Sequence, residues 1–297
     1  MLSEKPWKPE AVLRLLLSVF VCYFTGSILV SAMQFAVAGK RLSLGFVLVA
    51  IGAIAFLSAM PILVRKPWTL ENFTRRMVAL LICFWAGLML GGWTFKLAGP
   101  LPSIMSAGQL TIAILSFQGA MLILIPGFLR ENQVSFNDAF GWSNQWIHAL
   151  LYGLITACIF LRVGQALQWV SVQVIEHLSH FKLGEQSAVQ TVRNTSSWVH
   201  RLVLGSGTIV VAPLAEEMLF RGILYPCIKA AGFPRLAFWG TAVAFAAVHM
   251  NLMNFLPLFV LALVLTLLYE KTNNLLAPIA THSLFNAVNF VMLLLQT

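Results

Sequence analysis

The sequence predicts an all-α fold, a polytopic transmembrane helical bundle of about eight or nine helices. Hydrophobic residues make up 59% of the 297 residues, and the mean hydropathy is +0.85. Charged residues make up only 10%, whereas a soluble domain carries about 25%. Apolar runs of about 20 residues, long enough to cross a bilayer, recur along the chain. These observations exclude an ordinary cytosolic enzyme, a soluble nucleic-acid-binding protein and a disordered chain.

Five apolar runs precede residue 176, and short loops carrying Pro, Gly or charged residues separate them. The first run is about twice as long as the h-region of a signal peptide, roughly 7–15 residues. We therefore expect it to be a retained transmembrane helix. The predicted spans are 11–38, 42–64, 75–97, 107–129 and 147–175.

A polar stretch at about 176–200 divides the chain into residues 1–175, helices of unassigned role, and residues 176–297, the expected functional core. The second part carries polar residues at membrane depth. Several of its helices are short for a full span, so we expect them to pack inside the bundle. They are predicted at 201–226, 234–249, 255–270 and 275–295.

The net charge of +9 comes from basic residues scattered through short loops rather than gathered on one face. This distribution is typical of contact with anionic lipid, so the expected surroundings are the bilayer and no nucleic acid. The Lys and Arg residues in the loops favour a cytoplasmic N-terminus. The single cysteines, without CxxC spacing, are expected to be small buried hydrophobes; they are Cys22, Cys83, Cys158 and Cys227.

Ionisable residues inside predicted spans mark candidate functional sites, because their burial in a membrane is costly. Glu216 and Glu217 are the only adjacent carboxylates in the chain, and Arg221 follows them. On a helix, Glu217 and Arg221 are i,i+4 neighbours that pair. Glu216 points about 100° away and lacks that partner. A salt-bridge cluster at a helix end would explain the same residues.

Two histidines extend this pattern. His249 ends a helix of small residues, and His282 precedes Asn286 by one turn in the last span. Taken singly, His249 is explained by an interior hydrogen bond, and His282 with Asn286 by polar contacts between helices. The other histidines lie in or beside loops and are expected to be solvated: His148, His177, His180 and His200.

Taken together, a carboxylate and two histidines on three helices suit metal-assisted or general-base hydrolysis. A further carboxylate or amide, such as that of Asn286, could activate water or hold an oxyanion. The sequence contains no HExxH and no GxSxG. The usual zincin arrangement and a serine nucleophile elbow are therefore excluded.

The ordered motifs Glu216-Glu217-xxx-Arg221, Phe245-xxx-His249 and His282-xxx-Asn286 resemble those of the CPBP family over about residues 185–295. This family, also called ABI, comprises type II CAAX prenyl endopeptidases and bacteriocin-processing or immunity proteins. The resemblance implies that Glu216 is the water-activating base and that His249 and His282 position the water or a metal.

The same resemblance implies that Asn286 stabilises the oxyanion and that Glu217 and Arg221 form the structural pair. One divalent ion, zinc first, would take Glu216, His249 and His282 as ligands. Whether a metal is used stays open.

We therefore expect an intramembrane endopeptidase in a bacterial plasma membrane. Its substrate would be a CaaX-like protein, a leader peptide or a membrane-protein segment. The alternative is a non-catalytic membrane scaffold, or a peptide-binding protein of the bacteriocin-immunity type, in which the polar residues stabilise the bundle. A transporter is disfavoured because no inverted repeat is visible.

Overall fold

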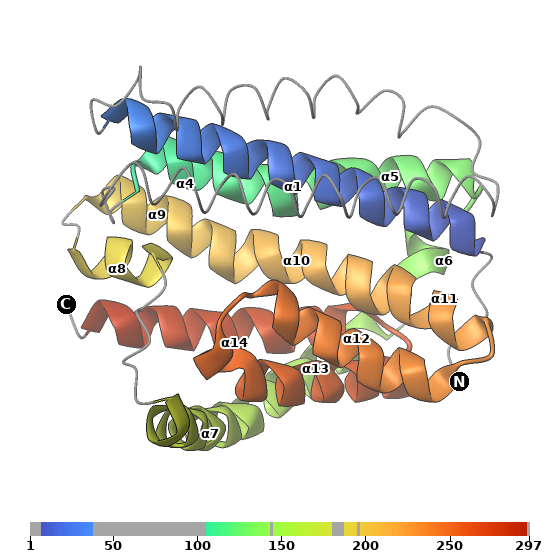
Figure 1. Cartoon of the computed structure of the whole chain (residues 1–297). Helices are drawn as coiled ribbons and strands as arrows, with labels where there is room; N and C mark the ends of the chain where they lie inside the picture. The colour runs from blue at the N-terminus through green and yellow to red at the C-terminus, as the bar shows by residue number, and fades with distance from the viewer. Residues whose placement is uncertain (1–6, 38–104, 143–144, 180–186, 195–196, 296–297) are drawn as a thin grey trace. The chain divides into compact units, whose positions relative to one another are not determined.

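A computed structural model describes residues 7–37, 105–142, 145–179, 187–194 and 197–295, and within these ranges all regular structure is helical. The predicted spans 42–64 and 75–97 lie outside the described residues. Elsewhere each predicted helix is present, so the all-α membrane bundle is confirmed for the described part of the chain (Figure 1).

The chain forms two compact units, residues 13–120 and residues 1–12 with 121–297. In the first unit, α1 (Pro9–Val37) contributes Tyr23, whose ring lies 5.3 Å from that of Phe117. Helix α4 (Ala107–Ile114) begins with a capping box between Ser106 and Gln109, which satisfies free N–H groups at the helix start.

The second unit contains the remaining helices, and it holds every residue of the candidate site. The helices that open this unit are α5 (Ala120–Glu131), α6 (Phe136–Phe140), α7 (Trp146–Ser179) and α8 (Ser187–Asn194). The helices that follow are α9 (Trp198–Ser206), α10 (Ala212–Glu217), α11 (Tyr225–Ala230), α12 (Pro234–Val248), α13 (Leu252–Thr272) and α14 (Leu276–Leu295).

Helices α9, α10 and α11 form one continuous run, interrupted by two π-helical segments, Gly207–Val211 and Met218–Leu224. Each segment ends just before a proline at the start of the next helix, Pro213 in α10 and Pro226 in α11. Proline lacks an N–H and clashes with the carbonyl four residues earlier. The regular i→i−4 ladder therefore widens at these two places.

Six described helical stretches are long and apolar enough to cross a membrane, and they make the chain a multi-pass membrane protein. They are Pro9–Ala36, Ala107–Glu131, Trp146–His177, Trp198–Ala230, Leu252–Thr272 and Leu276–Leu295. The expectation of several short C-terminal helices is wrong except for α12, which has 15 residues. The run from α9 to α11 and helix α13 each extend by one turn or more in total beyond the ranges predicted, whereas α14 matches its predicted range.

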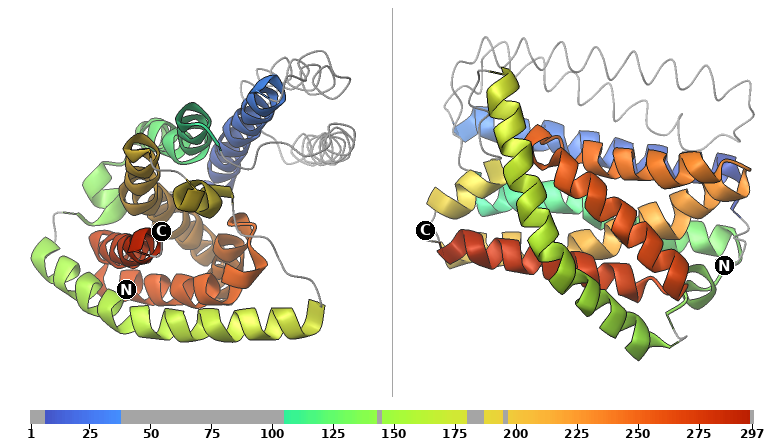
Figure 2. Two further views of the ribbon diagram at one scale, coloured as in Figure 1. Left: turned by 90° about the vertical axis from the view of Figure 1, so that its left-hand side faces the viewer. Right: turned by 90° about the horizontal axis from the view of Figure 1, so that it is seen from below.

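Helix α7 packs along both α13 and α14 (Figure 2). A Cβ on Gly153 of α7 would lie 2.5 Å from the carbonyl oxygen of Ala277 in α14, so only glycine permits this approach. Thr281 of α14 donates a 2.8 Å hydrogen bond to the Gly153 carbonyl. The compact unit thus joins α7 to the C-terminal helices, whereas the predicted functional division at residue 175 stays a prediction.

The described cysteines are free thiols, but only Cys227 is buried. The expectation that all are buried is wrong for Cys158, which is exposed on α7. An apolar thiol needs no protein cover on a helix whose outer side faces lipid tails.

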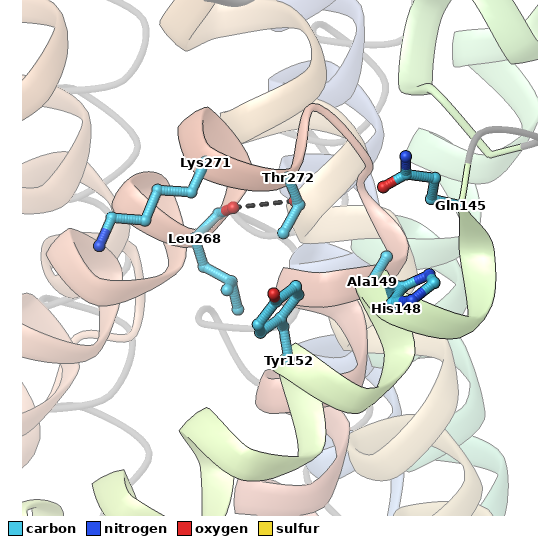
Figure 3. A pocket seen from close by; sticks show the side chains of 7 residues that line it. All are labelled: Gln145, His148, Ala149, Tyr152, Leu268, Lys271 and Thr272. Carbon is cyan, nitrogen blue, oxygen red and sulfur yellow. Dashed lines mark hydrogen bonds between the residues drawn. The ribbon is translucent and has the colours of Figure 1, made fainter.

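A cavity lies where the first turns of α7 meet the last turn of α13 (Figure 3). It is separate from the cluster of ionisable residues described next.

Candidate functional site

Glu216 and Glu217 end α10, between the two π-helical segments. Such segments occur frequently at functional sites. Both side chains are almost fully buried, with 4% and 0% of their surfaces exposed. The two carboxylates have different environments, however, because they point to different neighbours.

Glu217 forms the i,i+4 ion pair with Arg221 at 2.7 Å. The second guanidinium nitrogen of Arg221 donates to the carbonyl oxygen of Ala262 in α13 at 3.1 Å. The guanidinium also lies 4.4 Å from the centre of the Phe245 ring. These contacts offset the free-energy cost of burying the charged Arg221 side chain, which would be large without a partner.

His282 of α14 also contacts Glu217, with its Nδ1 3.0 Å from the Glu217 Oε1 atom. A carboxylate oxygen paired with an arginine accepts hydrogen bonds, so Nδ1 of His282 carries a proton and donates to Glu217, which leaves Nε2 turned away from this contact. Glu217 therefore joins the arginine to a histidine. Sequence reasoning missed this second contact, since nothing local links positions 217 and 282.

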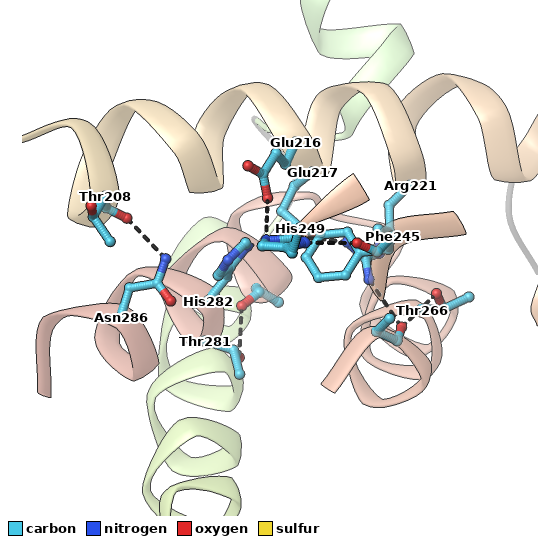
Figure 4. Close-up of polar contacts among 12 residues, drawn as sticks. Thr208, Glu216, Glu217, Arg221, Phe245, His249, Thr266, Thr281, His282 and Asn286 are labelled. Atoms are coloured by element: carbon cyan, nitrogen blue, oxygen red, sulfur yellow. Dashed lines mark hydrogen bonds and ion pairs between the residues drawn. The ribbon is translucent and has the colours of Figure 1, made fainter. Parts of the chain in front are cut away.

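His249 follows the last residue of α12, and its Nδ1 lies 2.7 Å from the Phe245 carbonyl oxygen. A carbonyl oxygen only accepts, so Nδ1 carries the proton and Nε2 is directed elsewhere. Nε2 lies 3.8 Å from the Glu216 Oε2 atom (Figure 4). Nδ1 of each histidine is thus held by an oxygen acceptor.

Glu216 Oε2 is buried and has no hydrogen-bond partner among the described residues. A distance of 3.8 Å to His249 is too long for a direct hydrogen bond and leaves both atoms able to share a bridging water. His249 is the most accessible member of the cluster, with 26% of its side chain exposed.

Phe245 lies at the centre of the cluster, and its ring is fully buried. Its ring centre is 5.0 Å from that of His249 and 5.6 Å from that of His282. The same ring contacts Arg221. Sequence reasoning included Phe245 only as part of a motif, although the spacing Phe-xxx-His already places both side chains on one helical face.

Asn286 lies one turn after His282, and its Nδ2 donates a 2.9 Å hydrogen bond to the Thr208 carbonyl oxygen. Thr208 belongs to the first π-helical segment. One amide hydrogen is used in this bond, and the second is available to another acceptor. The structure thus places Asn286 on the helix of His282, tied to the run that carries Glu216 (Figure 4).

The residues predicted to bind metal do not form a three-ligand site. Among the described residues, no group of three His, Cys, Asp or Glu side chains is arranged to hold a metal ion. Glu216 and His249 face each other, but the ring of His282 is anchored on Glu217 instead. A catalytic zinc site commonly has three protein ligands, so this arrangement does not fit one.

Comparison with known proteins gives a match over the same helices. Residues 198–288 match the family model described as type II CAAX prenyl endopeptidase Rce1-like. The chain is 34% identical over 85 residues to the uncharacterized protein YpbD of Bacillus subtilis. This alignment covers 27% of this chain and 40% of YpbD.

The chain is also 33% identical over 78 residues to the UPF0177 protein YxdF of Lactococcus lactis. This alignment covers 26% of this chain and 42% of YxdF. The chain therefore spans about two fifths of the length of these curated relatives. No solved structure matches the chain. The matched segment begins with α9 and ends in α14, so it includes all three motifs, and over residues 198–288 the chain is similar to the Rce1-like type II CAAX prenyl endopeptidases, as those motifs predict.

Proposed function

We propose that this protein is an intramembrane endopeptidase that hydrolyses a peptide bond with water activated by Glu216. The observation that carries the proposal is the Glu216 carboxylate, which lacks the arginine pairing of Glu217 and whose buried Oε2 atom, without a hydrogen-bond partner among the described residues, faces Nε2 of His249. The buried Oε2 atom of Glu217 also has no such partner, but the other oxygen of Glu217 binds Arg221 and His282. A buried polar atom without a partner is uncommon in a native structure and calls for a functional explanation.

In the proposed mechanism, a water molecule donates one of its two hydrogens to Glu216 and the other to the Nε2 lone pair of one of the two histidines, His249 or His282. Glu216 removes a proton as the water oxygen attacks the scissile carbonyl carbon. The free amide hydrogen of Asn286 donates to the developing oxyanion. Glu216 then gives the proton to the leaving amine, so the C–N bond breaks and Glu216 returns to its starting state.

Peptide hydrolysis inside a membrane requires access for water, and the α12–α13 turn supports such access. Fifteen helical residues in α12 reach about 22 Å, less than the roughly 30 Å of the hydrocarbon core. The turn lies within the length of the longer helices beside it (Figures 1 and 2). Non-helical backbone at membrane depth occurs where protein buries it or water fills a cavity.

The rival explanation is a non-catalytic membrane scaffold or a bacteriocin-immunity-type peptide-binding protein. Glu217, Arg221 and His282 support it, since they contact one another and stabilise the bundle. Glu216 does not, because it has no hydrogen bond with a described residue through either oxygen, whereas Glu217 has two partners on one oxygen. We therefore favour the hydrolase.

The test is turnover of a prenylated CaaX peptide, a leader peptide and a transmembrane peptide by the purified protein in lipid nanodiscs. We expect cleavage of at least one class and no cleavage by Glu216→Gln. Chelator treatment followed by zinc addition tests the metal-assisted alternative, which the arrangement of the described residues does not favour. Peptide binding with unchanged affinity in both proteins and cleavage in neither would support the scaffold instead.

A further inference from the structure

The cavity between α7 and α13 has a volume of about 390 Å³, within the range of roughly 300–1,000 Å³ typical of ligand sites. It lies in the same compact unit as the candidate site but shares no residue with it. Its lining consists of Gln145, His148, Ala149, Tyr152, Leu268, Lys271 and Thr272 (Figure 3).

This lining is amphipathic and carries no carboxylate. Leu268 and Ala149 are buried and form an apolar floor. Lys271, His148 and Tyr152 have no hydrogen bond or ion pair with a described residue. The cavity therefore offers a cation and two further polar groups beside an apolar surface.

The neighbouring carboxylate, Glu270, does not neutralise the cavity. It accepts hydrogen bonds from Tyr225 and Lys229, which lie on α11. Lys271 therefore has no ion pair with a described carboxylate. The start of α7 adds the positive end of a 34-residue helix, which also favours an anion.

The cavity lies at the ends of two candidate membrane spans, Trp146–His177 and Leu252–Thr272. Exposed aromatic side chains accompany it, with Trp146 53% and Tyr152 57% exposed. Trp and Tyr concentrate at the level of the lipid headgroups. This depth places the polar rim among headgroups and the apolar floor beside acyl chains.

We propose that this cavity binds the phosphate of an anionic phospholipid, with Lys271 and His148 near the phosphate and Leu268 and Ala149 against the first acyl carbons. The combination of cation and apolar floor selects a lipid over a soluble anion. The site is independent of the proposed peptidase activity.

The test is binding of phosphatidylglycerol to the full-length protein in detergent, measured by native mass spectrometry and compared with phosphatidylcholine. We expect preferential binding of phosphatidylglycerol. Lys271→Gln should weaken it about fivefold, since one basic residue at an anionic membrane surface contributes about that factor. Lys271→Arg should retain binding, and His148→Gln should weaken it.

The matched control is Arg235→Gln, which removes an exposed cation outside the cavity, in the first turn of α12. It should leave lipid binding unchanged. Equal losses in the Lys271 and Arg235 variants would overturn the proposal by showing a general charge effect. Displacement of the lipid by inorganic phosphate or glycerol 3-phosphate at similar concentrations would overturn it in favour of a soluble anion.

Discussion

Glu216 and Glu217 are adjacent in the chain but have opposite surroundings. Glu217 binds Arg221 and His282 through one oxygen, whereas Glu216 has no hydrogen bond with a described residue. Loss of Glu217 breaks a buried ionic network, and loss of Glu216 removes only a base. Stability and activity should therefore separate at these two positions.

We expect Glu216→Gln to abolish turnover with a near-normal melting temperature. Glu217→Gln should lower the melting temperature and the folded yield, because a buried arginine without its partner costs about 3–5 kcal/mol. Turnover per folded protein and thermal unfolding in detergent measure both effects. Equal stability of the two variants, with activity lost only in Glu217→Gln, would reverse the roles.

His249→Ala and His282→Ala should each abolish turnover, and the double variant should be little worse, because members of one catalytic unit are not additive. A scaffold predicts additive losses of melting temperature with peptide binding retained. Near-normal turnover in either single variant contradicts the catalytic role of that histidine.

At the scale of elements, the contact between α7 and α14 positions His282. Gly153 permits the close approach, and the Thr281 hydrogen bond to its carbonyl holds the helix turn that carries His282. Small residues allow this contact between transmembrane helices. The candidate site thus depends on a helix that supplies none of its ionisable side chains.

Gly153→Ala should destabilise the protein by about 1–3 kcal/mol, the usual cost of overpacking, and should lower turnover because α14 shifts. Gly127→Ala is the matched control, since a Cβ on Gly127 of α5 meets no atom within 4 Å. Thermal unfolding and turnover of both variants provide the comparison. An unchanged melting temperature in Gly153→Ala would show that α7 and α14 can move apart without loss of stability, and would contradict the prediction.

The α12–α13 turn provides a second test at this scale. In a background without native cysteines, Met250→Cys should react with a charged thiol reagent, because we propose that water reaches the site at this turn. Val243→Cys is the control, since Val243 is also exposed but lies within α12 and should contact lipid. Both are measured by labelling in native membranes. Reaction of both sites only with an apolar reagent would exclude water at the turn.

At the scale of the whole molecule, the contacts of the second unit place several helix ends together. Lys229 at the end of α11 binds Glu270 at the end of α13. Leu275, just before α14, donates a hydrogen bond to the Phe140 carbonyl in α6. The start of α12, the end of α13 and the start of α14 therefore lie on the same side of the second unit.

We expect this side to be cytoplasmic, as the Lys and Arg residues in the loops predict. In the cysteine-free background, Ala231→Cys should be labelled from the cytoplasm and Asn194→Cys from the opposite side. Both positions are exposed. Labelling of oriented vesicles with an impermeant reagent measures this, and the reverse pattern would invert the orientation.

The match to the Rce1-like family covers residues 198–288, but the packing that supports those residues extends beyond them. Helix α7 lies along α13 and α14 although it precedes the matched segment. Its apolar pattern predicted a span, and that prediction is confirmed. The partners of α7 could not be predicted, because an apolar helix offers no pattern that distinguishes one neighbour from another.

The sequence by itself determined the features that depend on local spacing. Apolar runs of the required length marked the spans, and a separation of four residues paired Glu217 with Arg221. Both follow from the pitch of a helix, which is set by covalent geometry.

Only the tertiary structure decided which side chains meet across helices. It joined His282 to Glu217 over 65 positions and Arg221 to the Ala262 carbonyl over 41. It also left the buried oxygen of Glu216 facing His249. Such contacts depend on how whole helices pack, since a polar side chain in the interior bonds to whichever group the packing brings within reach.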